Sequence, residues 1–142
     1  MNILAVDDDR EMTELTAMLL RTHGFQVAIS NSAQEAIQLT RDPTLQAVVL
    51  DMMMPEMDGR EISRAIRQFS AIPIIILSAL SDPQSVASAL DSGADDYLVK
   101  PVTSDVLAAH LTRLIKRTGG LVAPPAPRPA GWVVKTEPIR GS

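Results

Sequence analysis

Five polar residues in this sequence stand where apolar runs end, and their side chains could act together. They are Asp7, Asp8, Asp51, Ser78 and Lys100. Carboxylates brought close together repel one another and raise each other's pKa, and a divalent cation relieves that repulsion. An all-oxygen ligand set suits Mg²⁺, and Mn²⁺ would accept the same ligands. A metal ion, a lysine and a serine around a nucleophilic carboxylate are what phosphoryl transfer needs, so the residue types indicate that chemistry.

The apolar runs before these residues predict buried strands, and the segments between the runs have helical spacing. The predicted strands cover residues 3–6, 25–29, 47–50, 74–77 and 97–99. The predicted helices lie near residues 12–19, 33–40, 59–69, 83–92 and 106–115, the first being marked by Met12, Leu15, Met18 and Leu19. Alternating strands and helices with short connections imply an α/β fold, a doubly wound parallel sheet with helices on both faces.

In such a sheet the carboxyl ends of the strands meet at one edge, where ligands bind in open α/β folds. Four of the predicted strands therefore deliver polar side chains to the same edge. Each residue also has an ordinary structural role open to it, since an aspartate or serine can cap a turn and a lysine can form a surface ion pair. Their arrival together at four strand ends favours a functional site over separate structural roles.

The order and spacing of these residues resemble the receiver domain of two-component response regulators. The resemblance covers residue 1 to about residue 117. It implies a flavodoxin-like, five-stranded sheet of strand order 2-1-3-4-5 with five helices. The matching segments are Val6 to Asp8, Leu50 to Gly59, Ser78 to Ala79 and Gly93 to Pro101.

The resemblance also implies roles for the site residues. Asp51 would accept a phosphoryl group from a sensor histidine kinase. Asp8 and Asp51 would bind Mg²⁺ together with the main-chain carbonyl of Met53, and Asp7 would act through a water molecule. Lys100 would pair with a phosphoryl oxygen. The chain would thus be a signalling switch that catalyses its own phosphorylation, and not a turnover enzyme.

Further positions are implied to control the switch and its lifetime. The hydroxyl of Ser78 would move to the phosphate, and the rotamer of Tyr97 would change with it. In the family, the residues two after the acceptor aspartate and two after the serine tune hydrolysis of the aspartyl phosphate. Here these are Met53 and Leu80, both apolar, so slow dephosphorylation is expected. The peptide bond before Pro101 is cis in the family.

Residues 93–97 and the basic segment 113–117 resemble OmpR/PhoB-type transcriptional regulators. Those proteins form homodimers through the fourth helix, the fifth strand and the fifth helix. The present sequence has Ser85 and Val86 in place of a usual Asp-Arg pair, and His110 where an arginine is common. A dimer formed by this face would therefore be more apolar than usual.

Composition sets further expectations. The chain has 142 residues, a formal net charge of −4 and no cysteine, which fits a cytoplasmic protein without disulfides or thiolate metal sites. No apolar run approaches the roughly 20 residues of a membrane span, and no signal peptide is recognised. We expect a receiver domain over residues 1–117, a Pro/Gly/Ala-rich linker over 118–131, and a tail or the start of an effector domain over 132–142. DNA would be contacted through a domain outside this chain.

Two other functions compete with this interpretation. Haloacid-dehalogenase-type phosphatases have an Asp-x-Asp motif after their first strand, and Asp7 and Asp9 have that spacing. Their pattern needs Thr or Val where Glu11 stands, and it leaves Asp51 without a role. The other competitor is an interaction module that keeps the fold without phosphorylation, which the complete set of acidic, serine and lysine residues disfavours.

Overall fold

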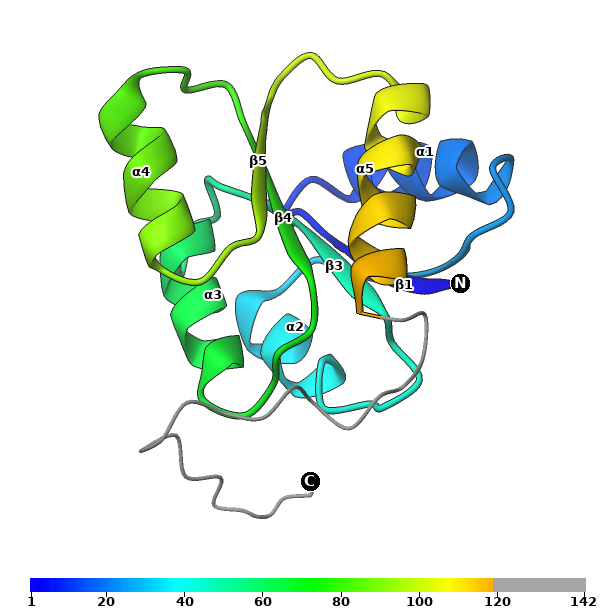
Figure 1. Ribbon diagram of the computed structural model, residues 1–142, viewed down its shortest axis with the longest axis horizontal. Coiled ribbons are helices and arrows are strands. Elements are labelled where there is room, and N and C mark those ends of the chain that lie inside the picture. Colours follow the sequence, from blue (N-terminus) through cyan, green and yellow to red (C-terminus); the bar gives the residue numbers. More distant parts are fainter. Residues whose placement is uncertain (119–142) are drawn as a thin grey trace.

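A computed structural model describes residues 1–118 and confirms the predicted alternation of strands and helices (Figure 1). The bounds of each strand differ from the expected ones by a single residue. The strands are β1 (Asn2–Val6), β2 (Gln26–Ser30), β3 (Ala47–Asp51), β4 (Ile74–Ser78) and β5 (Asp96–Val99). The helices are α1 (Arg10–Arg21), α2 (Ala33–Leu39), α3 (Gly59–Arg67), α4 (Pro83–Asp91) and α5 (Ser104–Arg117).

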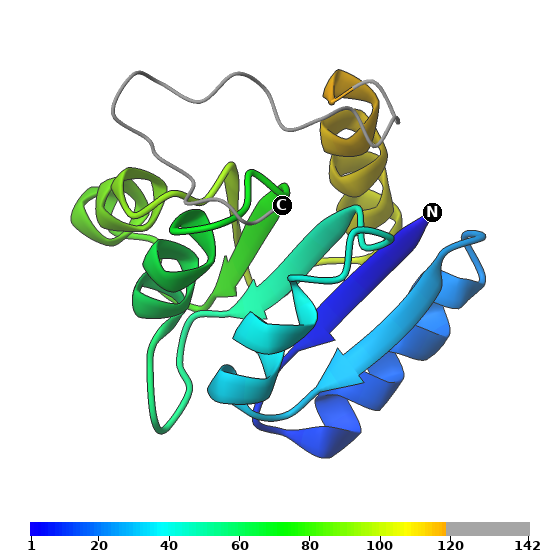
Figure 2. The ribbon, with the colours of Figure 1, turned by 90° about the horizontal axis from the view of Figure 1, so that it is seen from below.

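The strands form one parallel sheet of order β2-β1-β3-β4-β5, as predicted. Figure 2 shows α2, α3 and α4 on one side of the sheet and α1 and α5 on the other. Each layer encloses its own apolar core, one reaching from Leu4 to Ile62 and Ala89, the other from Ile3 to Leu20 and Leu111.

The central strand β3 is buried along its whole length. Its apolar residues pack into both cores, and each fully buried aliphatic side chain contributes roughly 1.5–3 kcal/mol. Asp51 is the last residue of this strand and is only 8% exposed. The packing of β3 therefore fixes where the Asp51 carboxylate lies.

The helices begin at polar residues that accept hydrogen bonds from their first backbone N–H groups. Such a cap stabilises a helix by about 1 kcal/mol. The capping residues are Asp9, Ser32, Asp58, Asp82 and Thr103. Because each helix follows the strand before it after a loop of two to seven residues, these caps also end the loops at the carboxyl edge of the sheet.

Helix α1 forms where predicted, but its apolar stripe does not face the core. The side chains of Met12, Leu15, Met18 and Leu19 are exposed. The sheet is instead contacted by the buried residues Thr13, Ala17 and Leu20. The spacing of the apolar residues identified the helix correctly, but the residues that it buries are not those of the apolar stripe.

Among residues 1–118, the helices are all too short or too polar to cross a membrane. The expected linker over 118–131, apart from Thr118, and the expected segment 132–142 lie outside the described residues.

Candidate functional site

The carboxyl edge of the sheet brings Asp51 and Lys100 into direct contact. Lys100 follows β5, and its Nζ donates a hydrogen bond to Oδ1 of Asp51 at 2.5 Å. The other carboxylate oxygen, Oδ2, accepts from the backbone N–H of Met53 at 3.3 Å. Both oxygens of this nearly buried carboxylate are thus held in a fixed orientation, as a nucleophile requires.

Asp7 and Asp8 complete an acidic cluster with Asp51. One carboxylate oxygen from each lies within 4.8 Å of the others. Burial, and then the negative charge of Asp51, raise the pKa of Asp7 from its ordinary 3.8 to about 6, although a backbone hydrogen bond from Asp9 opposes the shift. Three carboxylates beside the single positive charge of Lys100 leave a net negative charge on a cluster of oxygen ligands, which is the chemistry that binds Mg²⁺. The residues present therefore fit that ion.

The loop that carries Asp7 is fixed by residues that the sequence did not point to. The side-chain amide of Asn31 donates to the backbone oxygen of Asp7 at 2.8 Å and to Oγ1 of Thr13 at 3.0 Å. Asn31 follows β2, and Val6 is paired with Ser30, so the loops after these two neighbouring strands lie side by side. Strand order together with a polar residue after β2 was the signal that could have identified Asn31.

Ser78 and Tyr97 both hold the loop after β4 through one residue, Leu80. Oγ of Ser78 accepts from the backbone N–H of Leu80 at 3.0 Å. The hydroxyl of Tyr97 donates to the backbone oxygen of Leu80 at 2.7 Å, and the Tyr97 ring is buried. The backbone N–H of Lys100 donates to the oxygen of Ser78 at 2.8 Å, which joins this loop to the Lys100 segment.

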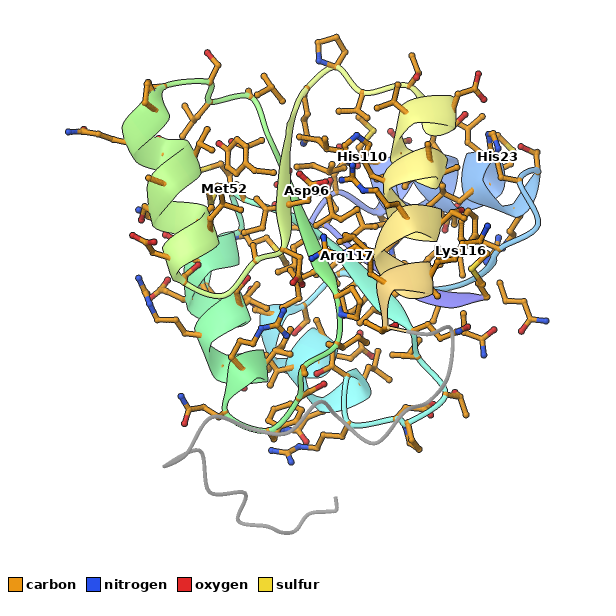
Figure 3. All side chains as sticks on the ribbon, in the orientation of Figure 1. His23, Met52, Asp96, His110, Lys116 and Arg117 are labelled. Atoms are coloured by element: carbon orange, nitrogen blue, oxygen red, sulfur yellow. The ribbon has the colours of Figure 1, made fainter. Side chains whose placement is uncertain are left out.

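The loop after Asp51 alternates between buried and exposed methionines. Met52 and Met54 are buried in the core, whereas Met53 is exposed, as is Leu80 after β4. The label of Met52 in Figure 3 lies in the interior, between α4 and β5. Gly59 lets the start of α3 pack tightly on this loop, because a Cβ there would lie 3.2 Å from Cα of Met52.

The cavity at the acidic edge is small, and a wider groove lies elsewhere. A cavity of about 20 Å³, room for one water molecule, is lined by Asp7 and Asp51. An open groove of about 760 Å³ runs between α5 and the end of α1, lined by residues such as Phe25 and Lys116. We place the site at the acidic edge because the carboxylates, the serine and the lysine converge there.

The geometry does not support the phosphatase motif. The Asp9 side chain accepts a hydrogen bond from the backbone N–H of Met12 at 3.2 Å and caps α1. Asp8, and not Asp9, contributes to the acidic cluster with Asp7 and Asp51. The Asp-x-Asp spacing is therefore a consequence of a helix cap that follows an acidic pair.

A model of the response regulator receiver domain matches residues 3–112. The chain belongs to this family. Its receiver fold, its place in two-component signalling and the resemblance to OmpR-type regulators are thereby confirmed. The Lys100–Pro101 bond is cis, as the resemblance implied.

Individual receivers show the same likeness. The response regulator MprA of Mycobacterium leprae is 40% identical over 119 residues, which are 83% of this chain and 52% of that protein. The DNA-binding response regulator MtrA of Mycobacterium tuberculosis is 36% identical over 115 residues, 81% of this chain and 50% of that protein. The receiver domain of the Francisella response regulator 1452 superimposes with a TM-score of 0.78 at 33% identity, covering 82% of this chain and 98% of that one. The chain thus spans about half the length of the curated relatives it matches.

Proposed function

We propose that this receiver accepts a phosphoryl group on Asp51 from a sensor histidine kinase in an Mg²⁺-dependent transfer. The observation that carries the proposal is the convergence of Asp7, Asp8, Asp51, Ser78 and Lys100 at one sheet edge, with Lys100 bonded to Asp51. We expect the chain to act in the cytoplasm as a switch and not as a turnover enzyme.

In the transfer, a carboxylate oxygen of Asp51 attacks the phosphorus of the phosphorylated histidine. A bond forms between that oxygen and phosphorus, the phosphorus–nitrogen bond breaks, and the histidine ring keeps the electron pair and takes up a proton. Lys100 stands 2.5 Å from Asp51 and can follow the phosphoryl oxygens with its positive charge. Positioning and charge neutralisation of this kind account for most catalysis of phosphoryl transfer.

The acidic cluster would hold Mg²⁺ through Asp8, Asp51 and the main-chain carbonyl of Met53, with Asp7 acting through water; Mn²⁺ would suit the same ligands. The bound ion supplies positive charge that neutralises the phosphoryl oxygens. The raised pKa of Asp7 supports this assignment, because it reflects burial and carboxylate repulsion that a cation relieves.

Phosphorylation would reset the loop after β4. The phosphoryl group adds roughly −1.5 to −2 charges beside Ser78 and Lys100. If the Ser78 hydroxyl turns to a phosphoryl oxygen, it gives up its bond to the N–H of Leu80. Tyr97 holds the opposite side of Leu80, so a change at Ser78 reaches β5 through a single residue. This connection supports the predicted switch at Ser78 and Tyr97.

The apolar side chains beside the acceptor support a long-lived phosphorylated state. Met53 and Leu80 are exposed at the edge of the site. Neither side chain offers a strong hydrogen-bond partner for the water molecule that hydrolyses the aspartyl phosphate. We therefore propose slow dephosphorylation.

The exposed stripe of α1 is a suitable docking surface for the kinase. Helix α1 begins directly after the acidic pair, so Met12, Leu15 and Leu19 extend from the edge of the site. An apolar helix face of this kind fits the helix of a partner. Substituting Leu15→Glu should weaken transfer from the kinase and leave phosphorylation by a small phosphate donor unchanged.

The output would pass to a partner or to a further domain. Leu90, Val99 and Val106 are exposed on the face of α4, β5 and α5, which supports a homodimer through that face. Nδ1 of His110 lies 2.5 Å from Oδ2 of Asp96 (Figure 3). The guanidinium of Arg113 donates to the same oxygen at 3.2 Å, so the charge of Asp96 is already paired within the chain. The relatives include a DNA-binding response regulator of which the matched segment covers only 50%, so we propose that the output is transcription, exerted through an effector domain.

The test is incubation with acetyl phosphate or phosphoramidate and Mg²⁺, followed by intact-protein mass spectrometry. We expect one phosphoryl group per chain, lost when Mg²⁺ is chelated and absent in Asp51→Asn. Asp91→Asn is a matched control, since Asp91 is an exposed carboxylate at the end of α4. No incorporation, even with a cognate kinase, would favour a receiver fold that works without phosphorylation.

A further inference from the structure

Three consecutive methionines follow the acceptor aspartate, and their exposure differs sharply. Met52 is 3% exposed and Met54 is 7% exposed, whereas Met53 is 65% exposed. The backbone of Met53 is anchored to the site, because its N–H donates to Oδ2 of Asp51. An exposed thioether is therefore carried by a residue whose backbone is hydrogen-bonded to the acceptor carboxylate.

Packing does not explain this side chain. An apolar group that stays two-thirds exposed gains little from the hydrophobic effect. Its buried neighbours Met52 and Met54 already fill the core at this loop. What distinguishes Met53 is access: an oxidant in solution reaches its sulfur, while the sulfur atoms on either side are shielded.

We propose that Met53 is an oxidation site that shortens the lifetime of the aspartyl phosphate, an inference that rests on the proposed phosphorylation of Asp51. The oxidant is a hydroperoxide. A sulfur lone pair attacks the terminal peroxide oxygen, a sulfur–oxygen bond forms and the oxygen–oxygen bond breaks. The leaving oxygen keeps the electron pair of that bond and takes up the proton of the transferred hydroxyl. The sulfur is oxidised by two electrons to a sulfoxide, and the peroxide is reduced to water or an alcohol.

The consequence follows from the change in polarity. The thioether of Met53 is a weak hydrogen-bond acceptor, whereas a sulfoxide oxygen is strong and carries a dipole. At the edge of the site, it can accept a hydrogen bond from a water molecule and orient that water toward the phosphorus. A single well-placed hydrogen bond of this kind accelerates hydrolysis roughly three- to tenfold.

The experiment uses the whole chain and hydrogen peroxide. Peptide mass spectrometry locates the sulfoxides, and the decay of the phosphorylated protein is timed after the phosphate donor is removed. We expect a sulfoxide on Met53 before Met52 or Met54, and decay roughly three- to tenfold faster than in untreated protein. Met53→Gln should decay quickly without peroxide, because its amide oxygen replaces the sulfoxide oxygen.

Two substitutions separate this site from general oxidative damage, each compared with its own untreated sample. Met53→Leu removes the sulfur and should make the decay insensitive to peroxide. Met18→Leu removes another exposed methionine, on α1, and should leave the sensitivity in place.

An unchanged decay with Met53 fully converted to the sulfoxide overturns the inference alone. So does equal sensitivity of Met53→Leu and the unsubstituted protein. Failure to take up phosphate before any oxidation overturns the proposed function, and the inference with it.

Discussion

Replacing Asp7 with asparagine should stabilise the metal-free protein at neutral and higher pH. The substitution keeps the shape of the side chain and the oxygen that accepts from the N–H of Asp9 at 3.0 Å. It removes the charge that burial and Asp51 disfavour. The direction of the pH dependence follows from the protons bound by the folded and unfolded states. The pKa of Asp7 is about 6 in the folded chain and 3.8 ordinarily, so the folded state binds more protons between those values. The free energy of unfolding therefore falls as the pH rises from about 4 to about 6.

The magnitude can be bounded in two ways. A pKa change from 3.8 to about 6 corresponds to about 3 kcal/mol at most, and solvent screening of the half-exposed Asp7 reduces this to about 1 kcal/mol. Independently, two carboxylate charges within 4.8 Å of each other repel by about 1 kcal/mol or more at the dielectric constant of water, and by more in the protein. We therefore expect Asp7→Asn to raise the melting temperature by about 4 °C at pH 8.

The assay is thermal and urea unfolding in EDTA at about pH 4.5 and pH 8, with both proteins measured side by side so that other titrating groups cancel. The advantage of the variant should shrink toward zero at the lower pH. Excess Mg²⁺ should reverse it, because ligand binding stabilises the folded state by about 2.7 kcal/mol at a hundredfold excess over the dissociation constant. An advantage that is equal at both pH values, or one that persists in Mg²⁺, would refute the electrostatic reasoning.

Three further substitutions test the backbone geometry and the hydrogen bonding of the fold. Gly24→Ala and Gly93→Ala both place alanine at a positive φ, +91° and +118°, but the new Cβ meets nothing within 4 Å at Gly24 and lies 2.6 Å from Cγ of Arg67 at Gly93. In urea unfolding, the free energy of unfolding should fall by about 1 kcal/mol for Gly24→Ala and by about 2–3 kcal/mol for Gly93→Ala. Tyr97→Phe removes the hydrogen bond to Leu80 and should lower the free energy of unfolding by about 1 kcal/mol. Amide hydrogen exchange in the loop after β4 should become faster. Unchanged exchange would mean that the bond does not restrain this loop.

The residue pattern predicted the parallel sheet and the residues that cluster at its edge, whereas the strand order was implied by the resemblance to receiver domains. This worked because the carboxyl ends of parallel strands must share an edge, so Asp51 and Lys100 could be brought together without coordinates. The exposure of individual side chains could not be predicted from the sequence. Spacing marked Met12 and Leu15 as one face of a helix, but whether that face meets the sheet depends on how the helix is rotated about its axis.

The supporting contacts were also beyond prediction. Asn31 reaches the loop of Asp7 from a neighbouring strand. The backbone of Leu80 donates one hydrogen bond to Ser78 and accepts one from Tyr97, which the side-chain type of Leu80 does not indicate. Backbone partners depend on three-dimensional placement and leave no residue-type signature.

The carboxylates at the acidic edge destabilise the fold by repelling one another, whereas the buried strand β3 stabilises it. β3 is buried from end to end, so it holds Asp51 in place even though the carboxylates around it repel. A flexible support would let Asp7 and Asp51 move apart and relieve the repulsion without a cation. Because the sheet prevents this, the repulsion remains available as binding free energy for whatever positive charge arrives, either a metal ion or the ammonium group of Lys100. The burial of β3 therefore keeps the negative charge of this edge concentrated around Asp51.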